Sequence, residues 1–151
     1  MVAEDVLRKY PAKREYLLMI LHDIQNRNPR NYLPEEDLKT VAEYLNTTLA
    51  SVYGVVGYYS MLSLRPRGRY VIRLSRSPVC ECMGGREAFR TLSELLGVGN
   101  NETTPDGRFT LETSECLGLC DGAPAMMVNE TPHEALDRDS MEAILQRYRE
   151  Q

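Results

Sequence analysis

Apolar residues recur at the spacing of an α-helix in three stretches of the first 65 residues. Residues 11–29 predict the first helix, residues 32–46 the second and residues 47–62 the third. Pro34 suits the first turn of the second helix, and Thr47 or Thr48 suits the N-cap of the third. The apolar stripes of the first two helices consist of Leu17, Ile20, Leu21, Ile24, Leu38, Val41, Ala42 and Leu45. The pattern therefore predicts an N-terminal helical bundle over residues 1–65.

A different pattern follows residues 65–69, which form a basic break that contains Pro and Gly. The order of predicted elements beyond it is strand, helix, strand, strand and helix, over residues 70–75, 85–98, 109–116, 125–129 and 137–150. Residues 100–108 are rich in turn formers and predict a loop. We therefore expect an α/β domain over residues 66–151. Its core-facing residues are expected to be Phe89, Leu92, Leu95, Leu96, Phe109, Leu111, Met141, Ile144, Leu145 and Tyr148.

Two glycines complicate the third predicted helix. Gly54 and Gly57 fall within it, and each costs about 1 kcal/mol relative to Ala in a helix interior. The sequence leaves two explanations open, either a weaker helix or one that packs closely against a neighbour.

Composition and charge narrow the class of protein. Hydrophobic residues make up 42% of the 151 residues, which is enough for a packed core. The net charge of −4 argues against a nucleic-acid-binding protein, including one built on a helix-turn-helix. No apolar run approaches the roughly 20 residues of a membrane span, and the first residues lack the pattern of a signal peptide. We expect a cytoplasmic protein that does not insert into a membrane.

The four cysteines fall in two short Gly-containing segments. Cys80 and Cys82 follow the first predicted strand, and Cys116 and Cys120 follow the second, so both pairs are expected at the rim of one small sheet. The spacing of Cys116 and Cys120 lets both sulfurs point into one pocket. Cys80 and Cys82 would point to opposite faces of an extended strand, so they share a centre only if their segment turns.

Thiolates are the natural ligands of iron–sulfur clusters and of zinc, and both centres take four ligands. A zinc module, a thiol–disulfide enzyme and a set of unrelated buried thiols remain alternatives. Zinc sites favour C-x₂₋₄-C pairs and thiol–disulfide enzymes favour C-x-x-C. This chain has C-x-C and C-x₃-C and matches neither pattern closely.

No residue of the chain is expected to be catalytic or to bind a dinucleotide. The segment GVGNNE at 97–102 does not match the G-x-G-x-x-G fingerprint. His22 and His133 belong to no convincing catalytic set, and Ser75 and Ser114 have no adjacent base.

Three motifs together resemble one family. They are CLGLCDGAPAMMVN at 116–129, YLPEEDLKTVAEYLN at 32–46 and SVYGVVGYYSML at 51–62. The chain resembles the thioredoxin-like [2Fe–2S] subunits of NADH-oxidising complexes, a family found in respiratory complex I, NAD-reducing hydrogenases, electron-bifurcating hydrogenases and formate dehydrogenases. The resemblance covers nearly the whole chain. It implies an α+β protein in which an N-terminal helical bundle precedes a thioredoxin-like α/β [2Fe–2S] ferredoxin domain.

The resemblance also implies cluster ligands, with one departure. Cys80, Cys116 and Cys120 match three of the family's ligands, and the position of the fourth falls on Ser75. Cys82 is an additional cysteine, so Cys80, Cys82, Cys116 and Cys120 are the expected metal ligands. Two other outcomes remain open, in which Ser75 binds iron through its oxygen or the cluster has been lost.

For function, the resemblance implies one-electron transfer beside the flavin of a partner subunit. The expected partners are a flavin- and NAD(H)-binding subunit and further iron–sulfur subunits, with residues 1–65 docking onto the flavin subunit or folding back onto their own sheet. The chain is not expected to be catalytic alone. Acidic Glu81, Glu115 and Asp121 would lower the cluster's potential or act as solvated loop residues. A cluster-free structural or regulatory module of the same fold is the alternative.

Overall fold

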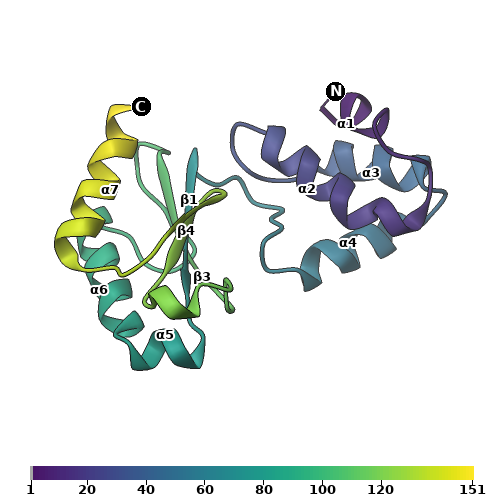
Figure 1. The fold of residues 1–151 in the computed structure, drawn as a ribbon. Coiled ribbons are helices and arrows are strands. Elements are labelled where there is room, and N and C mark those ends of the chain that lie inside the picture. The colour runs from purple at the N-terminus through teal and green to yellow at the C-terminus, as the bar shows by residue number, and fades with distance from the viewer. Residues whose placement is uncertain (1) are drawn as a thin grey trace. The chain divides into compact units, whose positions relative to one another are not determined.

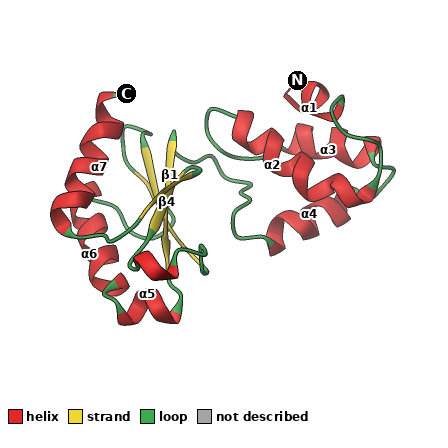
Figure 2. Ribbon diagram, viewed as in Figure 1, coloured by secondary structure: helices red, strands yellow, loops and turns green. Residues whose placement is uncertain are grey.

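The chain forms two compact units in a computed structural model that describes residues 2–151 (Figure 1). The first unit extends to Pro66 and the second runs from Arg67 to Gln151. The first is helical, and the second combines helices with a sheet (Figure 2). Helices and strands therefore segregate along the chain as the hydrophobic pattern predicts.

The N-terminal unit contains four α-helices and a short 3₁₀ turn within the described residues. They are α1 (Val2–Leu7), η1 (Arg14–Tyr16), α2 (Leu17–Arg27), α3 (Glu35–Tyr44) and α4 (Leu49–Tyr58). The three predicted helices are confirmed as α2, α3 and α4. Thr48 is the N-cap of α4, and its Oγ1 accepts a hydrogen bond of 3.2 Å from the Ser51 N–H. Helix α1 was not predicted as a separate element, because six residues are too few to show a period.

One apolar core holds this unit together. All eight residues of the two predicted stripes except Leu17 are buried in it, and Leu17 packs against it partly exposed. Ala3, Val6 and Leu7 of α1 and Val52 and Val56 of α4 complete the core. Burial of these side chains, rather than helix propensity, accounts for the stability of such short helices.

Gly54 and Gly57 lie on the exposed side of α4. A Cβ built on either would meet no atom within 4 Å. Close packing of α4 inside this unit therefore does not explain the two glycines, and they leave a shallow strip of bare backbone on the surface of the helix.

The C-terminal unit is built on a mixed five-stranded sheet in the order β2-β3-β1-β4-β5. The strands are β1 (Tyr70–Ser75), β2 (Glu102–Thr103), β3 (Phe109–Ser114), β4 (Met126–Val128) and β5 (Thr131–His133). The helices are α5 (Pro78–Cys82), α6 (Gly85–Leu96), the 3₁₀ turn η2 (Cys120–Gly122) and α7 (Arg138–Glu150). The α+β fold class is confirmed. Elements α5, β2 and β5 are additions to the predicted order.

Helices α6 and α7 cover one face of this sheet (Figure 1). Ile72 and Leu74 of β1 and Leu111 of β3 meet Leu92 of α6 and Leu145 of α7 in a single core. Phe89, Leu95 and Tyr148 pack against it partly exposed, and the other expected core residues are buried. Alternation along β1 sends Arg73 and Ser75 to the opposite face.

Candidate metal centre

The two cysteine segments leave the sheet at the same edge. Strands β1 and β3 are parallel neighbours, and their registers end with Ser75 opposite Ser114. Parallel strands place their carboxyl ends together, so Cys80 and Cys116 both emerge beyond this edge. Sequence reasoning therefore placed the two segments correctly at the rim of the sheet.

The first segment folds into the short helix α5. Ser77 is its N-cap, and the Ser77 Oγ accepts a hydrogen bond of 3.3 Å from the Cys80 N–H. Pro78 follows at the first helical position, which proline favours. Cys80 lies on the inner side of this helix, and only 2% of its surface is exposed.

Gly85 allows α6 to begin directly against α5. A Cβ at this position would lie 2.7 Å from the Cys80 carbonyl oxygen, which is closer than real contacts allow. The preceding Gly84 has a φ of +98°, a conformation that favours glycine. Together the two glycines hold the backbone of Cys80 against the start of α6.

The second segment is a tight loop around Gly118. Gly118 has a φ of +78°, and its N–H donates a hydrogen bond of 3.4 Å to the Cys116 sulfur. The sulfurs of Cys116 and Cys120 lie 3.3 Å apart, and both residues are exposed. The loop thus presents two sulfurs side by side on the surface.

The Cys80 thiol sits among hydrogen-bond donors. Burial raises the pKa of Cys80, but hydrogen bonds from the Ser75 and Ser77 hydroxyls and from the Ala125 N–H lower it to a net value below the usual range. The surroundings of this buried sulfur therefore favour the thiolate, which is the form that binds metal.

The two exposed sulfurs of the second segment shift each other's pKa in opposite directions. The Gly118 N–H and the Cys120 thiol lower the pKa of Cys116, and Ser77 also donates to this sulfur. The pKa of Cys120 is raised because its thiol donates to Cys116 and because the negative charge of the Cys116 thiolate lies beside it. The charge of Cys80 acts on both sulfurs, so the three cysteines face one region.

Cys82 is not brought to this region. It lies exposed at the end of α5, next to exposed Val79 and Met83. Residues two apart on a helix point to different sides, so Cys80 and Cys82 diverge. Of the four expected ligands, the structure gathers Cys80, Cys116 and Cys120.

The acidic residues near the cysteines differ in their surroundings. Glu81 pairs with Arg76 at 3.3 Å and with Arg86 at 3.2 Å, which offsets its negative charge. Glu115 and Asp121 are both exposed and lie beside the second segment. The expected lowering of the potential therefore rests on Glu115 and Asp121 rather than on Glu81.

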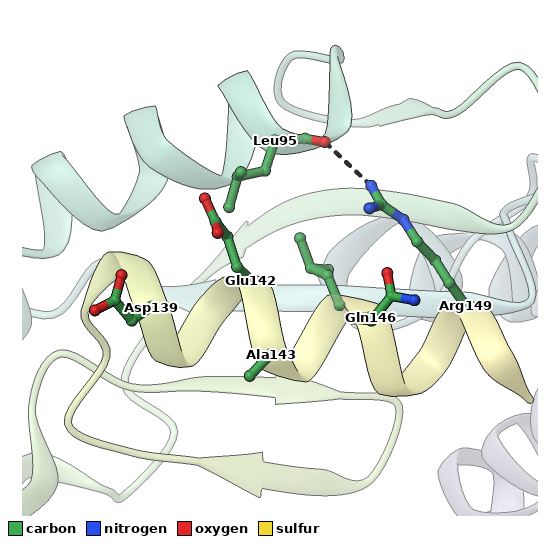
Figure 3. A pocket seen from close by; sticks show the side chains of 7 residues that line it. Leu95, Asp139, Glu142, Ala143, Gln146 and Arg149 are labelled. Atoms are coloured by element: carbon green, nitrogen blue, oxygen red, sulfur yellow. Dashed lines mark hydrogen bonds between the residues drawn. The ribbon is translucent and has the colours of Figure 1, made fainter.

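The C-terminal unit has two surface hollows whose linings do not include the gathered sulfurs. A groove of about 460 Å³ is bounded by Leu95 and by one side of α7, and Arg149 donates to the Leu95 carbonyl oxygen at 3.2 Å within it (Figure 3). A smaller hollow of about 280 Å³ adjoins α5 and is lined by Arg76, Glu81, Arg86, Phe89, Asn100 and Thr113. Neither lining contains a cysteine.

Sequence reasoning missed Ser77, which touches two of the gathered sulfurs. The Ser-Pro pair at 77–78 is the signal that indicates it, because serine at an N-cap followed by proline is typical of a helix start.

Within residues 2–151, no three Cys, His, Asp or Glu residues lie close enough together to hold one metal ion. No described helix is long and apolar enough to cross a membrane.

The fold and the cysteines together define a class of protein, in which an α/β unit carries cysteine sulfurs at the carboxyl edge of its sheet. The family model described as thioredoxin-like [2Fe–2S] ferredoxin matches residues 3–149, and the chain belongs to that family. The resemblance drawn from the sequence motifs is confirmed, as are the thioredoxin-like fold and the expected cofactor, a [2Fe–2S] cluster.

The chain is also similar in sequence to subunits of NADH-quinone oxidoreductases. The chain is 37% identical over 145 residues to a subunit of the NADH-quinone oxidoreductase of Aquifex aeolicus, covering 96% of this chain and 89% of the relative. It is 33% identical over 145 residues to NADH-quinone oxidoreductase subunit 2 of Thermus thermophilus, covering 94% and 79%. It is 39% identical over 139 residues to an NADH-quinone oxidoreductase subunit of Mycobacterium tuberculosis, covering 88% of this chain and 54% of the relative.

Solved structures share the fold. An NAD⁺-reducing [NiFe]-hydrogenase in the H₂-reduced state superposes with a TM-score of 0.77 at 23% identity, and the air-oxidised state with 0.74 at 21%. The matches cover 93% and 89% of this chain but 23% of the hydrogenase chain in each case.

The donor set fits a [2Fe–2S] cluster. Such a cluster takes two ligands on each of two irons, and sulfur is its preferred donor. The sulfurs of Cys116 and Cys120 lie 3.3 Å apart, and both feel the charge of Cys80, which has the Ser75 and Ser77 hydroxyls beside it. Three sulfurs and two hydroxyl oxygens therefore lie at one edge of the sheet, which matches the sulfur preference of such a centre.

Proposed function

We propose that this chain is the iron–sulfur electron-transfer subunit of a multisubunit NAD(P)H-linked oxidoreductase. The main support for the proposal is that Cys80, Cys116 and Cys120 converge at one edge of the sheet, in a chain that belongs to a [2Fe–2S] family. Relatives at 33–39% identity are named as subunits of NADH-quinone oxidoreductases. The chain is proposed to work within such an assembly, in the cytoplasm, and not to catalyse a reaction alone.

The residues of the site have separate roles in this proposal. Cys80, Cys116 and Cys120 would hold the cluster through their sulfurs. The bound cluster supplies one-electron storage. The Gly118 N–H donates to Cys116 and withdraws charge from that sulfur, and Ser77 does the same for Cys80 and Cys116. Hydrogen bonds to ligand sulfurs raise a cluster's reduction potential, so these groups oppose the effect of nearby acids.

The partner proposed for this chain is a flavin- and NAD(H)-binding subunit, with further iron–sulfur subunits beyond it. The helical unit offers apolar side chains for docking. Tyr58 at the end of α4 is 82% exposed, and Tyr59, Met61 and Leu64 after it are exposed as well. Exposed aromatic and Met residues are enriched at protein interfaces, and the bare strip at Gly54 and Gly57 permits close approach.

The test is to purify the tagged chain anaerobically from its natural cells with whatever binds it. We expect a flavoprotein to copurify, and NADH to reduce the cluster in that complex but not in the isolated chain. Dithionite is expected to reduce both samples. Reduction of the isolated chain by NADH alone, or a complex without flavin, would contradict the proposal.

Replacing Tyr58 with Ser tests the docking surface. The variant is expected to lose most of the copurifying flavoprotein and to keep its iron. Tyr32, a partly exposed tyrosine of the same unit outside α4, is the matched control position. Equal recovery of the flavoprotein with Tyr58→Ser and wild type would place the interface elsewhere.

A further inference from the structure

The gathered donors form one complete sulfur pair and one incomplete pair. Cys116 and Cys120 present two sulfurs 3.3 Å apart. The second cysteine of α5, Cys82, lies away from Cys80, whose thiol is hydrogen-bonded to the hydroxyls of Ser75 and Ser77. A centre that takes two ligands on each iron therefore meets a sulfur and a hydroxyl oxygen on the Cys80 side.

Cys82 is held away by the structure of α5. The Ser77 carbonyl accepts from the Glu81 N–H at 2.9 Å, and the Val79 carbonyl accepts from the Met83 N–H at 3.0 Å. Glu81, between the two cysteines, is tied to Arg76 and Arg86. Turning Cys82 inward would break these contacts and unwind the helix that Ser77 caps.

We propose that Ser75, and not Cys82, supplies the fourth ligand of the cluster, through its side-chain oxygen. The inference rests on the proposed function, because it concerns the same centre. Ser75 Oγ binds an iron as an alkoxide, and its proton passes to water when the Fe–O bond forms. The site would then have three sulfur donors and one oxygen donor.

Ser75 is favoured over Ser77 by what each side chain already does. The Ser77 Oγ accepts the Cys80 N–H as the helix cap and contacts the sulfurs of both segments. Ser75 is the last residue of β1, is 2% exposed, and is fixed by a 3.1 Å hydrogen bond from its N–H to the Ala125 carbonyl. Its hydroxyl donates to the Cys80 sulfur and accepts only a long contact of 3.4 Å from the Ser77 N–H, so no strong backbone bond holds its oxygen away from an iron beside Cys80.

An oxygen ligand gives the centre distinct properties. Oxygen is a harder donor than thiolate and suits oxidised iron better than reduced iron. We expect a lower reduction potential than that of a centre with four sulfur ligands, and iron that is lost more readily to chelators.

Three single variants of the full chain, Ser75→Ala, Ser75→Cys and Cys82→Ser, test the inference. Each is purified anaerobically, and iron, acid-labile sulfide, the EPR spectrum of the reduced protein and its reduction potential are measured. Circular dichroism and thermal melting identify variants that do not fold. Ser75→Cys serves as the second variant at this position, because it restores a ligand whether or not Ser75→Ala folds well.

The inference predicts that Cys82→Ser keeps about two irons and two sulfides per chain. Cys82→Ser should also keep the wild-type EPR spectrum and potential. Ser75→Ala should lose most of its iron. Ser75→Cys should keep its iron, raise the reduction potential and alter the EPR spectrum.

Loss of the cluster in Cys82→Ser would overturn the inference, as would an unchanged spectrum and potential in Ser75→Cys. A folded Ser75→Ala variant with full iron content would overturn it too. These results differ from a failure of the proposed function, in which the wild-type chain itself would bind no iron when isolated with its partners.

Discussion

The Gly118 N–H donates to the Cys116 sulfur across a loop that brings this sulfur within 3.3 Å of Cys120. Gly118 makes this geometry possible because its φ of +78° lies in the left-handed region. Replacing Gly118 with Ala should cost about 1–2 kcal/mol of unfolding free energy and reduce the iron content of the purified chain. Urea unfolding and an iron assay measure the two effects.

Gly107 provides the matched control for this variant. It has a φ of +68° and no atom within 4 Å of an added Cβ, and it lies in the turn before β3. Gly107→Ala should lose a similar amount of stability and keep its iron. Equal iron loss in both variants would indicate general unfolding rather than a specific effect at Cys116.

Gly85 sets the distance between α5 and α6. Its replacement by Ala puts a methyl group against the Cys80 carbonyl and should displace α5, at a cost of about 1–3 kcal/mol. Iron binding should weaken with it, because Cys80 moves with the helix. Gly54→Ala in α4 is the control, where added bulk meets nothing and stability should rise by up to about 1 kcal/mol. A Gly85→Ala chain as stable as wild type would refute this role of Gly85.

A buried charge cluster lies on the side of the sheet away from α6. Arg67 Nη1 donates to both Glu112 carboxylate oxygens at 3.0 and 3.1 Å, and Arg73 Nε lies 3.4 Å from one of them. Glu112→Gln removes the only negative charge of this trio and should cost about 3–5 kcal/mol. Glu94→Gln, which breaks an exposed pair with Arg138, should cost less than about 1 kcal/mol. Urea unfolding measures the free energy of unfolding of both variants. Similar losses in both would show that the buried cluster contributes no more to stability than an exposed ion pair.

The lowered pKa of His133 predicts how the stability of the chain depends on pH. Burial lowers the pKa of His133 below its ordinary value, and the positive charge of Arg147 lowers it further. Between the folded and unfolded pKa values only the unfolded chain binds the proton, so stability is lost as pH falls below about 6.5. His133→Gln should show a smaller loss as the pH falls from neutral to mildly acidic values in urea unfolding. An identical pH dependence in wild type and variant would exclude this contribution.

Sequence patterns predicted the elements that have enough residues to show a period or a run of β-formers. Strand β1 was predicted at its observed bounds, Tyr70–Ser75, because this segment is rich in β-formers. Helix α5 has five residues, and its burial pattern depends on the contact with α6 rather than on its own sequence. Strands β2 and β5 have two and three residues, and their pairing with β3 and β4 defines them.

The sequence placed the candidate site at the rim of the sheet, and its full set of ligands stays a prediction. Cys116 and Cys120 are close in sequence and share a loop, so their spacing determined their pairing. The expectation for Cys82 assumed that its segment forms a turn, but residues 78–82 form a helix that points Cys80 inward and leaves Cys82 exposed. The role of Ser77 depends on the packing of two segments that are far apart in the sequence.

The most direct test of the central claim is EPR spectroscopy of the wild-type chain, purified anaerobically with its partners and reduced with dithionite, alongside iron and sulfide assays on the same sample. We predict an S = 1/2 signal with about two irons and two sulfides per chain. A sample without iron and without a signal would contradict the electron-transfer function and leave the chain as a structural subunit.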